Sequence, residues 1–150
     1  MIRHYTPRTI YHLPTGYHHC YHHGSHYSYY NGYYYRPHHN YYVVCRPPLG
    51  FVIAAAILRS ATLRPVVFLP TVTYVHPQYY YSEGAFYVQR SATEYEVVGP
   101  PIGAVVESIP NDCEEFVLEG QTYYKVDDTY YKAIYMEGVL MYEVVGKEVK

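Results

Sequence analysis

The chain repeats one short pattern three times: a tyrosine-rich segment interrupted by a two-residue turn. The copies run from Tyr27 to Arg36, from Tyr79 to Val88 and from Tyr123 to Lys132. Their turns are Asn31-Gly32, Glu83-Gly84 and Asp127-Asp128, and the aromatic pairs that follow are Tyr34-Tyr35, Phe86-Tyr87 and Tyr130-Tyr131. Three matches in register predict three copies of one structural unit.

The repeat extends beyond these segments. The second and third copies open with a Pro-Pro-x-Gly motif, at Pro47–Gly50 and Pro100–Gly103, and every copy closes on a Val-Val pair. Gly24 of the first copy aligns with Gly120 of the third. The first copy lacks its opening motif, which indicates a polypeptide that began further upstream. The expected divisions are residues 1–40, 41–99 and 100–150.

Regular turn signals predict an all-β fold. In the third copy, turn dipeptides separate four expected strands at residues 116–118, 121–126, 129–136 and 139–145. Short strands at this spacing are typical of a meander, a small SH3-like barrel or a β-sandwich-like arrangement. Two-residue loops also fix the strand register. The expected opposite pairs are Tyr29 with Tyr34, Tyr81 with Phe86, Lys125 with Tyr130, Ser28 with Tyr35, Tyr80 with Tyr87, and Tyr124 with Tyr131.

Two segments depart from this pattern. Nine of the ten His residues precede Asn40, in a stretch with almost no aliphatic residues. We expect this stretch to form a partly irregular N-terminal arm that keeps the repeat skeleton. Residues 53–64 have helical propensity, and a short helix is one reading of them.

Composition excludes several classes of protein. The net charge is −2 and the Lys and Arg residues are scattered, so the sequence offers no basic patch of the kind that binds nucleic acid. The longest apolar run, Phe51 to Leu58, is shorter than the ~20 residues that span a bilayer, so no transmembrane helix is expected. No signal peptide is visible after Met1. The three cysteines allow either one disulfide with a spare thiol or three reduced thiols.

The histidine-rich stretch is a candidate metal site. Its possible ligands are His18, His19, His22, His23, His26 and Cys20. Imidazole and thiolate are ligands for zinc, copper or nickel. In an extended chain, His18, Cys20, His22 and His26 share a face. The alternative is a low-complexity arm that binds metal only as an affinity tag does; no other cofactor is expected.

Tyrosine rings that point outward are a second candidate, an interaction surface for a partner protein or a carbohydrate. The residues are Tyr29, Tyr34, Tyr81, Phe86, Tyr124, Tyr130 and Tyr131. Exposed aromatic patches usually mark interaction sites. The alternative, favoured for most of these rings, is that they pack against the next copy.

Catalysis is not expected. Glu114-Glu115 and Asp127-Asp128 are carboxylate pairs, but the first reads as a strand edge and the second as a turn. His76 is isolated and reads as a loop residue. The chain contains no Ser-His-Asp order, nucleophile elbow, Walker loop or dinucleotide fingerprint.

The Pro-Pro-x-Gly, Tyr-Tyr and Val-Val pattern resembles a family of Tyr-rich bacterial domains of unknown function. The resemblance is closest from Val97 to Gly146. It implies an all-β fold in an exported protein of the periplasm or cell surface, and it brings no catalytic residues. The function that we expect is a non-enzymatic envelope module that associates with itself, with another envelope protein or with a wall polysaccharide. Metal buffering or sensing by the histidine-rich stretch is the alternative.

Overall fold

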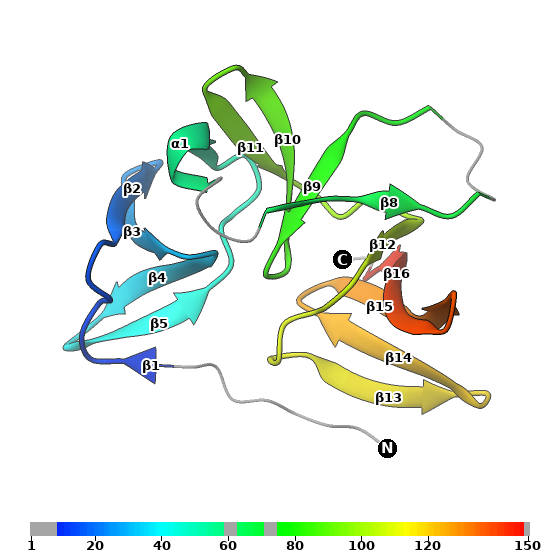
Figure 1. Cartoon of the computed structure of the whole chain (residues 1–150). Helices are drawn as coiled ribbons and strands as arrows, with labels where there is room; N and C mark the ends of the chain where they lie inside the picture. Colours follow the sequence, from blue (N-terminus) through cyan, green and yellow to red (C-terminus); the bar gives the residue numbers. More distant parts are fainter. Residues whose placement is uncertain (1–8, 59–62, 71–74, 149–150) are drawn as a thin grey trace. The chain divides into compact units, whose positions relative to one another are not determined.

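The computed structural model describes residues 9–58, 63–70 and 75–148 of the chain. Within these ranges the protein is almost entirely β, with three antiparallel sheets of short strands and one short helix, α1 (Ala55–Leu58) (Figure 1). The helix lies in the segment for which helical propensity allowed one. Residues 59–62, the next part of that segment, lie outside the described residues.

Each copy of the repeat builds one sheet. The first copy supplies β1 (Thr9–Ile10), β2 (His18–His22), β3 (Ser25–Tyr30), β4 (Tyr33–His38) and β5 (Tyr41–Cys45). The second supplies β6 (Val52–Ala54), β7 (Arg64–Pro65), β9 (Tyr79–Ser82), β10 (Ala85–Ser91) and β11 (Glu94–Val98). The third sheet contains β12 (Ala104–Val106), β13 (Glu114–Leu118), β14 (Gln121–Val126), β15 (Thr129–Met136), β16 (Val139–Lys147) and the added β8 (Val67–Phe68).

The three sheets share one topology. Their strand orders are β1-β5-β4-β3-β2, β6-β11-β10-β9-β7 and β12-β16-β15-β14-β13, with β8 beside β12. In every sheet the first strand of the copy pairs with its last strand, which confirms that the sequence repeat is a structural repeat. None of the sheets closes into a barrel within the described ranges, so the SH3-like barrel that the sequence allowed is not formed.

The predicted register is confirmed in all three hairpins. Each of the six expected opposite pairs is found in the structure. The turns hold the left-handed backbone that two-residue hairpin loops require: φ is 48° at Asn31, 47° at Glu83 and 53° at Asp127. A charged residue therefore replaces the favoured Asn in two of the three turns.

The Val-Val ends differ by one residue between copies. Tyr87 and Tyr131 pair with the first valine of their copies, Val97 and Val144. In the first copy Tyr35 pairs with the second valine, Val44. The third copy keeps its register with a bulge between Tyr130 and Tyr131. The same Val-Val sequence is thus paired one residue out of step in the first copy, compared with the other two.

The opening and closing motifs of the repeat are joined by hydrogen bonds. The Gly50 N–H donates to the Val97 carbonyl at 2.9 Å, and the Gly103 N–H donates to the Val144 carbonyl at the same distance. Both glycines have positive φ, 85° and 90°, which is the conformation of the third residue of a type II turn. The two motifs recur together in the sequence because each supplies half of one contact.

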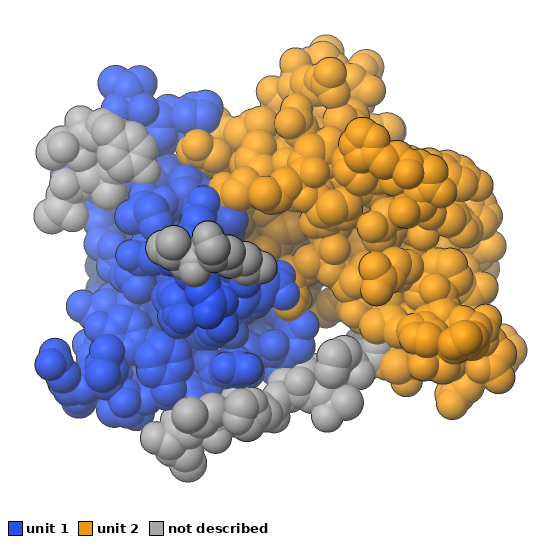
Figure 2. Space-filling model, turned by 180° about the vertical axis from the view of Figure 1, so that it is seen from behind, with its two compact units in different colours: residues 1–6, 66–77, 100–150 blue, residues 7–65, 78–99 orange. Residues whose placement is uncertain are grey.

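The chain divides into two compact units (Figure 2). Unit 2 contains residues 7–65 and 78–99, and therefore holds the first two sheets. Unit 1 contains residues 1–6, 66–77 and 100–150, and holds the third sheet. The histidine-rich stretch is more ordered than its composition predicts, since residues from Thr9 to Cys45 form a complete sheet. No helix among the described residues has the length and apolar character needed to cross a membrane.

Candidate functional site

Most of the aromatic side chains that the sequence offered as an interaction surface are buried. Tyr29, Tyr34, Phe86 and Tyr131 are each 1% exposed, and Tyr81 is 6% exposed. Tyr124 and Tyr130 are half-buried. Five of these seven side chains are therefore buried and present no ring to solvent. They pack inside the protein, which was the alternative to an interaction surface.

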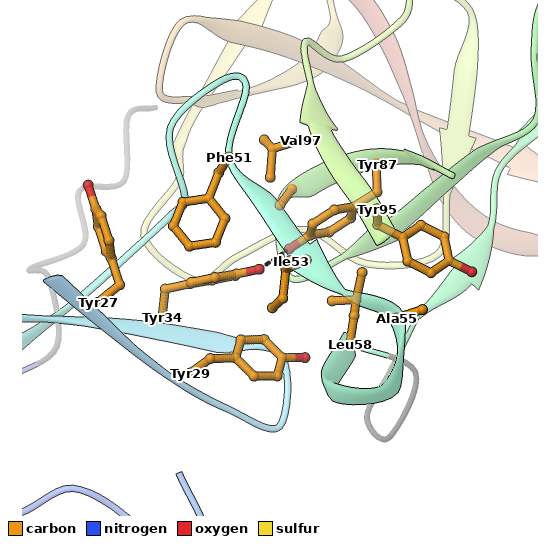
Figure 3. Packing of buried hydrophobic residues seen from close by; sticks show 11 residues of the cluster. Tyr27, Tyr29, Tyr34, Phe51, Ile53, Ala55, Leu58, Tyr87, Tyr95 and Val97 are labelled. Atoms are coloured by element: carbon orange, nitrogen blue, oxygen red, sulfur yellow. Dashed lines mark hydrogen bonds between the residues drawn. The ribbon is translucent and has the colours of Figure 1, made fainter. Parts of the chain in front are cut away.

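The buried rings of the first two copies form the core of unit 2. Tyr27, Tyr29 and Tyr34 extend from the first sheet, and Tyr87, Tyr95 and Val97 extend from the second sheet (Figure 3). Phe51 lies between them, with its ring centroid 5.5 Å from those of both Tyr27 and Tyr34. The Tyr34 and Tyr87 hydroxyls, which lie in a buried environment, share a hydrogen bond of 2.8 Å. This bond satisfies both phenols inside an otherwise apolar core.

Tyr29 and Tyr81 also have a local role at the turns. The Gly32 N–H donates to the Tyr29 hydroxyl at 3.1 Å, and the Gly84 N–H donates to Tyr81 in the same way. The rings of Tyr29 and Tyr34 meet edge to face with centroids 4.9 Å apart, as do those of Tyr81 and Phe86. These tyrosines fix the hairpin and leave no surface for a ligand.

Burial changes the ionisation of this core. Loss of solvent raises the pKa values of Tyr34, Tyr81 and Tyr87. At Tyr34 the neighbouring Tyr87 raises the pKa further. The same cause raises the thiol pKa values of Cys20 and Cys45, which pack against this core and form no disulfide. Such thiols are poor nucleophiles, because the thiolate is the reactive form.

The histidine-rich stretch forms a hairpin, which changes the faces that were expected of its side chains. The chain reverses at His23-Gly24, where φ is 47° and 80°. His26 pairs with Tyr21 across the strands, so it shares a face with Tyr21 and His19. The expectation that His26 lies with His18, Cys20 and His22 was wrong, because it assumed an extended chain through this turn.

The two faces of this hairpin have different environments. On one face, His22 packs against Phe51 with ring centroids 5.6 Å apart, and Cys20 packs against the core of unit 2. On the other face, His19 Nδ1 and His26 Nε2 lie 2.6 Å apart. His23, in the turn, packs on His22. No group of three or more metal-binding side chains occurs in the part of the chain that the structure describes.

An exposed apolar surface lies on the third sheet, in a place that the sequence analysis did not select. Tyr135 is 74% exposed, Val117 is 49% exposed and Leu140 is 39% exposed. The register places these residues on one face with Tyr124, Ala133 and Tyr142, because Tyr135 is opposite Leu140 and Ala133 is opposite Tyr142. We call these six residues the Tyr135 face.

Part of the Tyr135 face is equivalent to core residues of the second copy: Tyr124 and Tyr142 correspond to Tyr80 and Tyr95. Its exposed members Tyr135 and Leu140 lie in the longer β15–β16 hairpin, at positions where the second copy has the exposed Ser91 and Thr93. Tyr124 and Tyr142 meet edge to face with centroids 5.4 Å apart, and their counterparts Tyr80 and Tyr95 meet in the same way at 5.5 Å. In unit 2 these counterparts are part of the core that the second sheet shares with the first, and Tyr95 is 4% exposed. The aligned Tyr-Tyr and Tyr-Glu-Val-Val letters of the two copies were the signal for this equivalence.

The carboxylate pairs lie at a strand edge and in a turn, as expected. Glu114 and Glu115 begin β13, an edge strand of the third sheet. Asp127 has a positive φ in the β14–β15 turn. His76 packs its ring on Phe68, with centroids 3.8 Å apart, in the segment that follows β8.

Comparison with known proteins identifies the family. A model of a family of unknown function, DUF6515, matches residues 2–148. The chain belongs to this family. No curated protein matches the chain, and no solved structure matches it. The DUF6515 match extends over all three copies of the repeat, including the first.

Proposed function

We propose that this DUF6515 chain is a non-enzymatic association module that assembles with further copies of itself through the Tyr135 face. The observation that carries the proposal is the exposed apolar surface that Tyr135, Val117 and Leu140 form on the third sheet. In unit 2, Tyr80 and Tyr95, the counterparts of Tyr124 and Tyr142, belong to a core that two sheets of the repeat share. The occupant that this precedent favours is another sheet of the same kind, and a second copy of the chain supplies one.

The chemistry of the face supports association. Its exposed members are a tyrosine and two aliphatic residues, and rigid aromatic rings are typical anchors of interfaces. Tyr135 is the most exposed of the three, so it has the most surface to lose on binding. At about 25 cal/mol per Å², burial of such side chains stabilises a complex by a few kcal/mol in total.

Two parts of the proposal, the cell-envelope location and the lack of enzymatic activity, are based on the sequence. A cell-envelope location, in the periplasm or at the surface, follows from the resemblance to exported Tyr-rich domains. The non-enzymatic assignment follows from the lack of catalytic motifs in the sequence. Fractionation of the source cells tests the location, and recovery of the protein only with the cytoplasmic fraction contradicts it.

The test of self-association is the solution mass of the purified chain, measured by light scattering over a range of concentrations. We expect an oligomer whose dissociation constant rises tenfold or more in the double variant Tyr135→Ser, Leu140→Ser. The matched control is Tyr11→Ser, Leu49→Ser, since these side chains are 67% and 68% exposed but lie in unit 2. The control should associate as the natural chain does.

Salt dependence provides a second readout. Glu119 and Glu137 are exposed and occupy the turns that follow β13 and β15. Two identical faces bring these like charges together, so added salt should strengthen the association. A chain that stays monomeric at every concentration contradicts self-association, and binding of such a monomer to an envelope polysaccharide or protein then identifies a different occupant.

A further inference from the structure

One face of the β2–β3 hairpin carries two imidazoles whose ring nitrogens are in hydrogen-bond contact. His19 lies in β2 and His26 in β3, and the strands join through the turn at His23-Gly24. The Nδ1 atom of His19 and the Nε2 atom of His26 are 2.6 Å apart, while the ring centroids are 4.8 Å apart. The two nitrogens therefore lie between the ring centres, and the rings meet edge to edge rather than face to face.

Neighbouring side chains hold this pair in place. The Tyr21 ring lies nearly parallel to the His26 ring, with centroids 5.1 Å apart and planes at 23°. The Tyr17 ring meets His19 edge to face at 5.0 Å. Ser28, directly opposite His19, has a fully buried hydroxyl without a hydrogen-bond partner. The face thus combines two positioned imidazoles with an unsatisfied polar group next to them.

We propose that His19 and His26 together form a two-point binding site for a divalent transition-metal ion, with copper(II) the preferred ion. Imidazole is a good ligand for copper, nickel and zinc, and copper(II) binds nitrogen ligands most tightly among these ions. Calcium and magnesium require oxygen ligands. Residues 1–82 contain no Asp or Glu, so hard cations find no carboxylate in this part of the chain.

The separation of the two nitrogens is close to that of two ligands of one ion. With metal–nitrogen bonds of about 2.0–2.1 Å, two ligands at a right angle are about 2.9 Å apart, and two tetrahedral ligands are about 3.3 Å apart. The 2.6 Å contact is a hydrogen bond between the two rings, so binding of an ion by both nitrogens requires them to move apart to about 2.9 Å or more. The His19 side chain is exposed, so it has room for the rotation that directs both nitrogens to one ion.

This site differs from binding by histidines in general. In the neutral pair one N–H lies between these two nitrogens, so an ion that binds both requires the donor ring to take its other tautomer. The second imidazole is already within reach of an ion held by the first, which raises its effective concentration. His38 and His39, adjacent in sequence with ring centroids 4.6 Å apart, have exposed rings and make a matched control.

The experiment is a titration of the tag-free chain with copper(II) chloride, followed by calorimetry and electron paramagnetic resonance. We expect one equivalent to bind ahead of all others, with a spectrum that shows two imidazole nitrogens. His19→Gln and His26→Gln should each weaken this equivalent roughly tenfold or more, and the double variant should be no weaker than either single variant. His38→Gln, His39→Gln should leave the first equivalent unchanged.

Two results overturn the proposal. The first is an equal loss of affinity in the His38, His39 control, which shows adventitious binding by any exposed histidine. The second is an unchanged first equivalent in the His19 and His26 variants. A measurement on the natural chain adds independent evidence: substoichiometric copper(II) should broaden the ring-proton resonances of His19 and His26 before those of His38 and His39. Equal broadening contradicts the site.

Discussion

At the scale of single residues, the core of unit 2 is unusual because its large side chains are tyrosines. A buried phenol needs a hydrogen-bond partner, and Tyr34 and Tyr87 provide one for each other at 2.8 Å. Removal of one hydroxyl leaves the other buried and unsatisfied, whereas removal of both leaves an apolar pair of nearly the same shape.

Tyr34→Phe and Tyr87→Phe should therefore each lower the free energy of unfolding by about 1–3 kcal/mol. The double variant should lose clearly less than the sum of the two single losses, because the partners act as a unit. Urea unfolding of the four proteins gives the coupling energy. Strictly additive losses mean that the two hydroxyls do not interact.

At the scale of elements, the hairpins depend on residues with left-handed backbone. Gly138, in the β15–β16 turn, has a φ of 80°, and a Cβ added there meets no atom within 4 Å. The cost of Gly138→Ala is therefore conformational and should be about 1–2 kcal/mol in the free energy of unfolding. Gly146, in β16, also has open space but no positive φ.

Gly146→Ala is the matched control for Gly138→Ala, since the two glycines lie in the same hairpin. It should be neutral or slightly stabilising, because alanine reduces the freedom of the unfolded chain without strain. Denaturant unfolding monitored by circular dichroism measures both changes. Equal losses at the two positions mean that the turn conformation does not limit the stability of this hairpin.

At the scale of the whole molecule, charge is unevenly divided along the chain. Residues 100–150 contain ten Asp or Glu and four Lys, a net charge of −6, whereas residues 1–99 contain three Glu and seven Arg, a net charge of +4. The net charge of −2 is therefore the sum of an acidic third copy and a basic, histidine-rich remainder of the chain. Salt and pH should affect the two parts of the chain differently.

Alkaline pH should unfold unit 2 as a whole. Burial raises the pKa values of Tyr34, Tyr81 and Tyr87, so these groups hold their protons in the folded state after the same groups have ionised in the unfolded state. Stability is complete below a pH of about 10, the ordinary tyrosine pKa, and falls above it. Three such groups give a slope of about 4 kcal/mol per pH unit.

Parallel titrations of tyrosinate absorbance and far-ultraviolet circular dichroism measure this effect. The late tyrosinate signal should appear together with the loss of β structure. Ionisation of all tyrosines in a chain that keeps its β spectrum contradicts the burial of these three side chains. The natural chain at neutral pH, returned from alkali, is the control for reversibility.

Much of this fold was predictable from particular residues. The Asn-Gly and Glu-Gly turns and the tyrosine pairs predicted the six opposite pairs, because a two-residue loop leaves one register. The face that each copy directs to the shared core of unit 2 was not predictable. The first copy turns Tyr29 and Tyr34 into the shared core, and the second copy turns Tyr80 and Tyr87. Tyrosine occupies both faces of these strands, so the period-two pattern contains no polar and apolar contrast to choose between them.

The hydrogen bonds that join Pro-Pro-x-Gly to Val-Val were found only in the structure. The three copies, their turns and their strand pairs were predictable from the chain alone. These features are local, since each depends on residues within one copy. The tertiary structure alone decided that the first two copies share a core, that Tyr135 stays exposed, and that His19 meets His26 while His22 packs on Phe51. Such choices depend on which faces meet in space, and residues of one type on both faces of a strand cannot specify that in advance.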